Sequence, residues 1–154
     1  MKCPYYFNPM TIQELKRRWS KIDVKRAAIS IVSERKEDII DKNREQLMDG
    51  FDKEKKRLKK YASAAYAAKK NKRNPSPGYW NPDLYDKGGF QNSMKLNIQS
   101  KNMYEITSTD SKTPDLKKKY GATIFGLTTD NKEDVKYEII NPGLVAHIKK
   151  ETGL

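Results

Sequence analysis

The sequence predicts an α+β fold in which long N-terminal helices pack on a small antiparallel sheet, followed by short C-terminal helices. Three observations predict it: apolar residues at helical spacing before residue 50, a break rich in proline and glycine, and two alternating runs after that break. The 154 residues fit a single domain. We divide it into a basic helical half (1–73), a connection (74–93), and a hairpin with C-terminal helices (94–154).

The basic half begins with two predicted helices. Thr11 can cap the first, and Glu14 stands where a capping box needs its second member. One face of this helix is apolar: Ile12, Leu15, Trp19 and Ile22. The second helix is predicted from about Asp23 to Met48, with Gly50 as its stop. Its apolar positions are Ala28, Ile29, Val32, Ile39, Ile40 and Leu47.

The chain is poor in residues that form a core, because hydrophobic residues make up 36% and charged residues 34% of it. We therefore expect neighbouring subunits to complete part of the apolar packing. The faces that we expect to be buried, some of them only in an oligomer, lie around Trp19, Ile29, Val32, Ile40 and Leu47.

Nearly all of the net charge of +12 lies in residues 1–73, which hold 21 Lys or Arg against 10 Asp or Glu. The most basic stretch runs from Lys53 to Arg73, and its alanine-rich centre favours a helix. Such lysines can neutralise phosphates without reading base sequence, and Tyr61 or Tyr66 could stack on bases. An acidic protein partner or a solvated face explains the charge equally well. The residues predicted to contact nucleic acid or an acidic partner are Lys55, Lys56, Arg57, Lys59, Lys60, Lys69, Lys70, Lys72 and Arg73.

Three prolines and a glycine between residues 75 and 82 exclude a continuous helix or an interior strand from the connection. Aromatic residues are enriched at interface cores, so we predict that those of the connection form an oligomer interface. They are Tyr79, Trp80, Tyr85 and Phe90. Packing of these rings on their own domain is an equally strong interpretation. Asp83 and Asp86, before the two glycines, are interpreted as turn residues.

The second half of the chain has clearer local patterns. Polar and apolar residues alternate in Met94–Gln99 and Met103–Ser108, which predicts an antiparallel hairpin. Thr113 is then predicted to cap a short helix that ends at Gly121. The apolar piece ATIFGL that follows is expected to be buried, and the tail predicts two short helices split at residues 141–143.

Few residues could carry chemistry. With one cysteine (Cys3) and one histidine (His147), the chain can build neither an internal disulfide nor a zinc cluster. Four acidic residues at helical spacing could hold a divalent metal, as in a metal-dependent nuclease, but the basic residues between them favour a salt-bridged face. They are Glu37, Asp38, Asp41 and Glu45. We expect no enzymatic activity, no metal and no other cofactor.

No apolar run approaches the roughly 20 residues that a bilayer requires, and the first ten residues lack the apolar core of a signal peptide. We therefore expect no contact with a membrane. The sequence is typical of a protein used in a cytoplasm or in a particle.

Four stretches of the chain resemble a known family. They are GFDKEKKRLKKYASAAYAAKK, PDLYDKGGFQNSMKLNI, YEITSTDSKTPDLKKKYGATIFGLT and INPGLVAHIKKETGL, and the match spans roughly residues 46–154. These stretches are similar to small virion proteins of tailed phages of gut bacteria, in the neck, head-tail connector and tail-completion group. In that group a long helix precedes a TG-x-[FL]-x-x-S turn, a β-hairpin, and a segment ending in [YF]G before an IFGL piece.

The resemblance places residues 88–90 and Ser93 at the turn that leads into the first hairpin strand, where glycine permits a tight entry. Lys87 stands where the family usually has threonine, and Lys55 where it often has glycine in a tight turn. The motif is structural and carries over no catalytic residue.

The resemblance implies a connector-like structural protein that forms a ring and joins portal and tail around the DNA channel. Its implied partners are copies of itself, the portal and other neck or tail proteins, with non-specific contact to packaged DNA. It implies assembly in the bacterial cytoplasm and a place in the neck or tail of the virion. The alternative, from charge alone, is a basic nucleic-acid-binding protein without sequence specificity.

Overall fold

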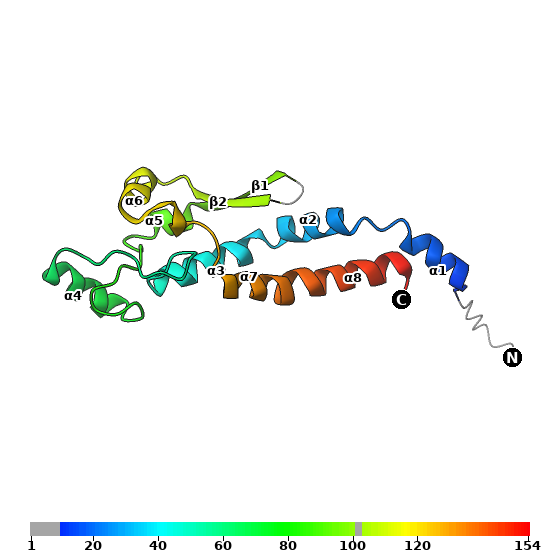
Figure 1. Cartoon of the computed structure of the whole chain (residues 1–154), viewed down its shortest axis with the longest axis horizontal. Coiled ribbons are helices and arrows are strands. Elements are labelled where there is room, and N and C mark those ends of the chain that lie inside the picture. Colours follow the sequence, from blue (N-terminus) through cyan, green and yellow to red (C-terminus); the bar gives the residue numbers. More distant parts are fainter. Residues whose placement is uncertain (1–9, 101–102) are drawn as a thin grey trace, which may run out of the picture.

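Helices lie side by side along most of the molecule's length (Figure 1). The computed structural model describes residues 10–100 and 103–154. One row of helices is α2 (Val24–Glu34) with α3 (Lys36–Met48). The other row is α7 (Thr129–Asp134), the π-helical η2 (Val135–Ile140) and α8 (Asn141–Thr152). A two-stranded antiparallel sheet packs on α3, which confirms the predicted α+β class.

The first predicted helix is confirmed as α1 (Ile12–Trp19), which contacts α8. The Thr11 hydroxyl accepts a hydrogen bond from the backbone N–H of Glu14 at 3.2 Å, so the predicted cap forms. The second half of the capping box does not form, because the Glu14 carboxylate pairs with Arg17 and Arg18 at 2.8 and 2.9 Å. Charge-assisted bonds to two guanidinium groups are stronger than one bond to a backbone N–H.

The long helix predicted from Asp23 to Met48 is present as two helices. The Asp23 carboxylate caps α2 by accepting from the Arg26 backbone N–H at 3.0 Å. Arg35, with φ −107° and ψ 23°, separates α2 from α3, and Gly50 follows α3 with φ +79°. α2 packs on α8 whereas α3 packs on β1, so the two halves of the predicted helix serve different neighbours.

The predicted split of the C-terminal tail at residues 141–143 is wrong, because helix continues through Pro142. Proline cannot donate a hydrogen bond, and its ring presses on the carbonyl four residues earlier. The wider π-helical turns of η2 come directly before this point and accommodate the ring. Gly143 then lets α8 approach α2, since a Cβ there would lie 2.9 Å from the Ile31 side chain.

The predicted hairpin is confirmed as β1 (Met94–Ser100) and β2 (Met103–Ser108), with Leu96 opposite Ile106 and Ile98 opposite Tyr104. The inner pair, Leu96 and Ile106, is buried, whereas the outer pair is 39% and 37% exposed. A single helical turn, α5 (Gly89–Asn92), leads into β1 after Gly88, whose φ of +84° favours glycine.

The next helix is α6 (Thr113–Tyr120), followed by Gly121 with φ +90°. Thr113 is its first residue rather than its cap, because the preceding turn is closed by Asp110, whose carboxylate accepts from the Lys112 N–H at 2.8 Å. The short 3-10 helix η1 (Ala122–Ile124) starts the ATIFGL piece. Its large apolar side chains are buried as predicted: Ile124, Phe125 and Leu127.

Two amides on α3 hold this apolar piece in place. Asn43 donates to the Ile124 carbonyl at 3.2 Å and accepts from the Gly126 N–H at 3.3 Å. Gln46 donates to the Gly126 carbonyl at 2.7 Å and accepts from the Thr128 N–H at 3.1 Å. Each amide therefore satisfies two backbone groups that burial would otherwise leave unpaired.

Only the second half of the basic stretch is helical, as α4 (Ala64–Arg73), which Ser63 caps by accepting from the Tyr66 N–H at 3.4 Å. Residues 50–62 are not helical and contain an isolated antiparallel bridge between Phe51 and Arg57. Lys55 there has a φ of +60°, at the position where the resembling family often has glycine.

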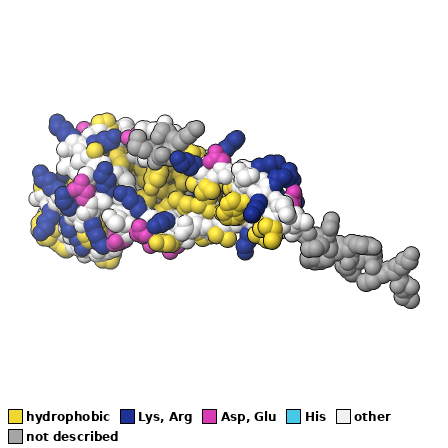
Figure 2. Space-filling model, turned by 45° about the vertical axis from the view of Figure 1, so that its right-hand side comes forward, with side chains coloured by type: hydrophobic (Ala, Val, Ile, Leu, Met, Phe, Trp, Pro, Cys, Tyr) yellow, Lys and Arg dark blue, Asp and Glu magenta, His cyan; other side chains and the backbone are white. Residues whose placement is uncertain are grey.

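The expected burial of apolar faces is met only in part. Val32, Ile40 and Leu47 are buried, Ile29 is half-buried, and Trp19 is 55% exposed. We use "the α1 end" for the region where further large apolar side chains are exposed: Ile12, Val24, Val145 and Leu154. In Figure 2 hydrophobic side chains also gather between the hairpin and the helices.

Within the described ranges, no helix combines the length and the apolar character that crossing a membrane would need.

Candidate functional site

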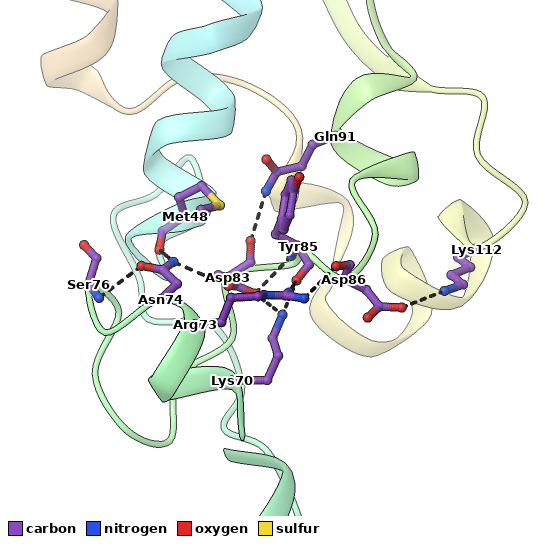
Figure 3. A network of polar contacts seen from close by, with 10 residues as sticks. All are labelled: Met48, Lys70, Arg73, Asn74, Ser76, Asp83, Tyr85, Asp86, Gln91 and Lys112. Carbon is purple, nitrogen blue, oxygen red and sulfur yellow. Dashed lines mark hydrogen bonds and ion pairs between the residues drawn. The ribbon is translucent and has the colours of Figure 1, made fainter. Parts of the chain in front are cut away.

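The opposite end of the molecule brings α4 against the connection, and we call this region the α4 end (Figure 1). A buried ion pair joins the two segments: the Lys70 ammonium lies 2.6 Å from the Asp83 carboxylate, and the two side chains are 8% and 0% exposed. Figure 3 shows this pair at the centre of a polar network. A buried charge is tolerated only when it is paired and hydrogen-bonded, so the rest of the network matters.

The Asp83 carboxylate has two further donors. It accepts from the Tyr85 N–H at 3.0 Å and from the Asn74 side-chain amide at 3.4 Å. The Asn74 amide also donates to the Met48 carbonyl at 3.0 Å, and the Gln91 amide donates to the Asp83 carbonyl at 3.0 Å. The network thus ties the connection to the ends of α3, α4 and α5 (Figure 3).

The last turn of α4 is held in the same way. Lys70 donates to the Tyr85 carbonyl as well as pairing with Asp83, and Arg73 donates to the Tyr85 and Asp86 carbonyls. The Arg73 guanidinium also lies over the Tyr85 ring, 5.4 Å from its centroid. Two of the predicted contact residues therefore serve the fold of this end.

Lys70 is consequently corrected from a surface contact to a buried residue, since Asp83 and the Tyr85 carbonyl occupy its ammonium. Three other members of the predicted set are exposed but engaged within the chain: Lys55 with Asp130, Lys56 with Glu54, and Arg57 with the Asp49 and Pro77 carbonyls. Four are exposed and pair with no acidic residue in the described part of the chain: Lys59, Lys60, Lys69 and Lys72.

The four aromatic residues of the predicted interface divide into two groups. Tyr79 and Trp80 are 46% and 37% exposed and pack edge to face, with ring centroids 5.6 Å apart. Tyr85 is half-buried, and Phe90 is buried against Phe125 at 5.7 Å between centroids. Phe90 therefore belongs to the protein's own core, and only the Tyr79–Trp80 pair presents a large apolar surface.

Three of the four acidic residues at helical spacing pair with basic neighbours, which confirms a salt-bridged, exposed face of α3. Arg44 lies 2.7 Å from Asp41 and 3.5 Å from Glu37, and Arg35 pairs with Asp38. Glu45 is exposed on the same helix. Among the residues that the structure describes, no group of three or more His, Cys, Asp or Glu is placed to hold a metal ion.

A cleft of about 580 Å³ opens beside the buried network, between the start of α4, the connection and α6. Four tyrosines line it: Tyr61, Tyr66, Tyr85 and Tyr120. Lysines line it as well: Lys70, Lys87, Lys112 and Lys119. Burial and the nearby Asp83 carboxylate raise the pKa of the Tyr61 hydroxyl, so this wall of the cleft stays uncharged.

Comparison of the chain with models of protein families, with curated proteins and with solved structures finds no match.

The sequence singled out many residues of the α4 end but not how they combine. Asp83 was interpreted as a turn residue, and its bond from the Tyr85 N–H confirms that. Its ion pair with Lys70 was missed, because a lysine among many lysines carries no sign of its partner. The prolines of the connection indicate only that this segment is neither helix nor interior strand, and they give no sign of the ion pair.

Proposed function

We propose that this protein is a structural virion protein of a tailed phage, a subunit of a ring at the neck or tail that joins portal and tail around the DNA channel. It acts without enzymatic activity or cofactor. Its partners are copies of itself, the portal and other neck or tail proteins, and it assembles in the bacterial cytoplasm. The resemblance of residues 46–154 to that group supports the proposal.

The observation that carries the proposal is the presence, among the described residues, of two groups of exposed apolar side chains. They lie on segments at opposite ends of the molecule, α1 and the connection beside α4 (Figure 1). One is the α1 end, where Ile12 and Trp19 are 71% and 55% exposed. The other is the Tyr79–Trp80 pair. Each subunit of a ring meets its two neighbours through two different surfaces, so a ring subunit needs two such regions.

Replacement of Trp80 by alanine is expected to weaken assembly and to leave the helical circular dichroism intact, because the ring is exposed and its partner Tyr79 is too. Tyr137→Ala is the matched control, since Tyr137 is also exposed but lies on η2. Loss of helical signal in Trp80→Ala would instead show that the ring serves the fold.

The proposed ring subunit also has a basic surface. It is formed by the four exposed lysines that have no acidic partner among the described residues: Lys59, Lys60, Lys69 and Lys72. It faces either the DNA path or an acidic neighbouring ring, and the two orientations are separable by charge reversal at Lys59 and Lys60. If the surface faces DNA, affinity falls steeply with salt, with a log–log slope of roughly 0.9 per phosphate contact, and does not depend on base sequence. If it faces protein, charge reversal blocks attachment of the ring to its neighbour while DNA affinity stays weak.

The same lysines favour the second candidate function, a nucleic-acid-binding protein that works without a ring.

The virion proposal is tested by interrupting the gene in its source genome and imaging the particles that form. A neck or tail subunit predicts DNA-filled heads that lack attached tails. Complete, infectious particles in the absence of the protein would contradict the proposal and favour the second candidate.

A further inference from the structure

The cleft at the α4 end has tyrosines in its walls, and one of them, Tyr66, is exposed. Tyr61 and Tyr66 meet edge to face, with ring centroids 5.0 Å apart. The Tyr66 side chain is 44% exposed. The cleft that it lines has a volume of about 580 Å³, which is large enough for a small aromatic group. Tyr120 also lines the cleft, from the last turn of α6, and the Lys119 ammonium lies over its ring, 5.1 Å from the centroid.

The charges of the cleft are mainly positive. Lys112 is paired with Asp86 at 3.4 Å, and the Asp110 carboxylate is used by the Lys112 backbone N–H. Lys87 and Lys119 line the cleft, are exposed, and pair with no acidic side chain that the structure describes. The cleft therefore offers cations at two points of its rim and leaves little negative charge to oppose an anion.

The floor of the cleft is rigid before any ligand arrives. Lys70 reaches it from α4 and is fixed by Asp83 and the Tyr85 carbonyl. Gly88, also in the lining, is held by a bond to its carbonyl from the Asn92 N–H at 2.8 Å. A site whose walls are already ordered loses less entropy on binding.

We propose that this cleft binds single-stranded nucleic acid, with a base stacked on Tyr66 and phosphates paired with Lys87 and Lys119. Aromatic side chains beside a positively charged groove are the two parts that such binding uses. A duplex fits poorly, because its bases are already stacked and cannot reach rings inside a concave site. An acidic peptide would satisfy the lysines but would leave the tyrosine faces without flat partners. The inference concerns the cleft alone and holds whether or not the protein forms a ring.

The test uses the full chain and a fluorescent oligothymidine of about 10 nucleotides, with binding followed by anisotropy. Tyr66→Ala is expected to weaken binding roughly 5- to 150-fold, which corresponds to the loss of one stacked base. Tyr66→Phe should bind as the wild type does, because stacking needs the ring and not the hydroxyl. Tyr137→Ala, a change at an exposed tyrosine that does not line the cleft, should also leave binding unchanged.

A second pair of variants keeps the test independent of any effect of Tyr66 on folding. Lys119→Glu in the cleft should weaken binding more than Lys149→Glu on α8, although both residues are exposed and both changes alter the net charge equally. Equal losses in the two charge variants, or in Tyr66→Ala and Tyr137→Ala, would overturn the proposal. So would equal affinity for a duplex of the same length, or displacement of the oligonucleotide by polyglutamate at matched charge.

Discussion

At the α4 end, charged and polar groups are buried with their partners inside the chain, whereas at the α1 end large apolar side chains stay in contact with solvent. The buried Lys70–Asp83 pair is 2.6 Å long and carries four further hydrogen bonds from or to neighbouring groups. Trp19, by contrast, is 55% exposed on a helix of eight residues. In the described part of the chain, no buried side-chain nitrogen or oxygen lacks a partner.

The difference shows that the two ends are stabilised by different means. A buried polar network fixes one geometry, because any displacement leaves a group unpaired at a cost of about 1–3 kcal/mol. The hydrophobic effect is not directional, so any partner that removes the apolar side chains from water stabilises them. The polar network of the α4 end is therefore satisfied within the described part of one chain, whereas the α1 end exposes apolar side chains that only a covering partner would bury.

The largest effect is expected from Asp83→Ala, which breaks the network of the α4 end. It leaves the Lys70 ammonium buried without its carboxylate and removes the acceptor of the Tyr85 N–H. We expect the free energy of unfolding to fall by about 3–5 kcal/mol, measured by urea denaturation. The control is Glu54→Ala, which removes an exposed pair with Lys56 and should cost less than about 1 kcal/mol. Similar losses in both variants would contradict the role given to the network.

The sequence predicts local features of both ends better than their long-range partners. The Thr11 cap and the hairpin were predicted because each depends on residues a few positions apart. The continuous helix through Pro142 was not, because the π-helical turns before it have no local signature. At the candidate site the sequence marked the lysines and aromatics. Burial of Lys70 and Phe90 depends on contacts with distant segments, which no local pattern contains.

The next effect concerns the packing of α2 on α8. Gly143→Ala would usually stabilise a helix by up to about 1 kcal/mol, but here the new methyl group meets Ile31 at 2.9 to 3.0 Å. We expect the overpacking to dominate and to lower the free energy of unfolding by roughly 1–3 kcal/mol. Combining Gly143→Ala with Ile31→Val should recover part of the lost free energy of unfolding. If Gly143→Ala alone were more stable than the wild type, α2 and α8 would separate easily enough to accommodate the methyl group.

A smaller change in the stability of the isolated chain is expected from Trp19→Lys at the α1 end. Because the ring is exposed, the monomer should lose no more than about 0.5 kcal/mol. The Tm of the wild type should rise with protein concentration, since assembly binds only the folded state, and the Tm of the variant should not. Thermal unfolding at several concentrations measures this, and a wild-type Tm independent of concentration would argue against assembly through α1.

The smallest effect is a pH dependence of α1. Hydrogen bonds from Arg17 and Arg18 lower the pKa of Glu14 from its usual 4.5 to about 2. Because the folded pKa is the lower one, the contribution is present above pH 4.5 and is lost as the pH falls toward 2. NMR titration of the carboxyl group should show the low pKa, and Glu14→Gln should remove this acid transition. A pKa of the Glu14 carboxyl group near 4.5 would show that Arg17 and Arg18 do not lower it.

Light scattering coupled to size exclusion tests the central claim most directly, that the uncovered apolar surfaces join subunits into a ring. For the purified chain we expect one homogeneous species that contains at least three copies of the 17.9 kDa chain and that persists on dilution. A monomer at every concentration, above all one that binds DNA tightly, would contradict the claim and favour the nucleic-acid-binding alternative.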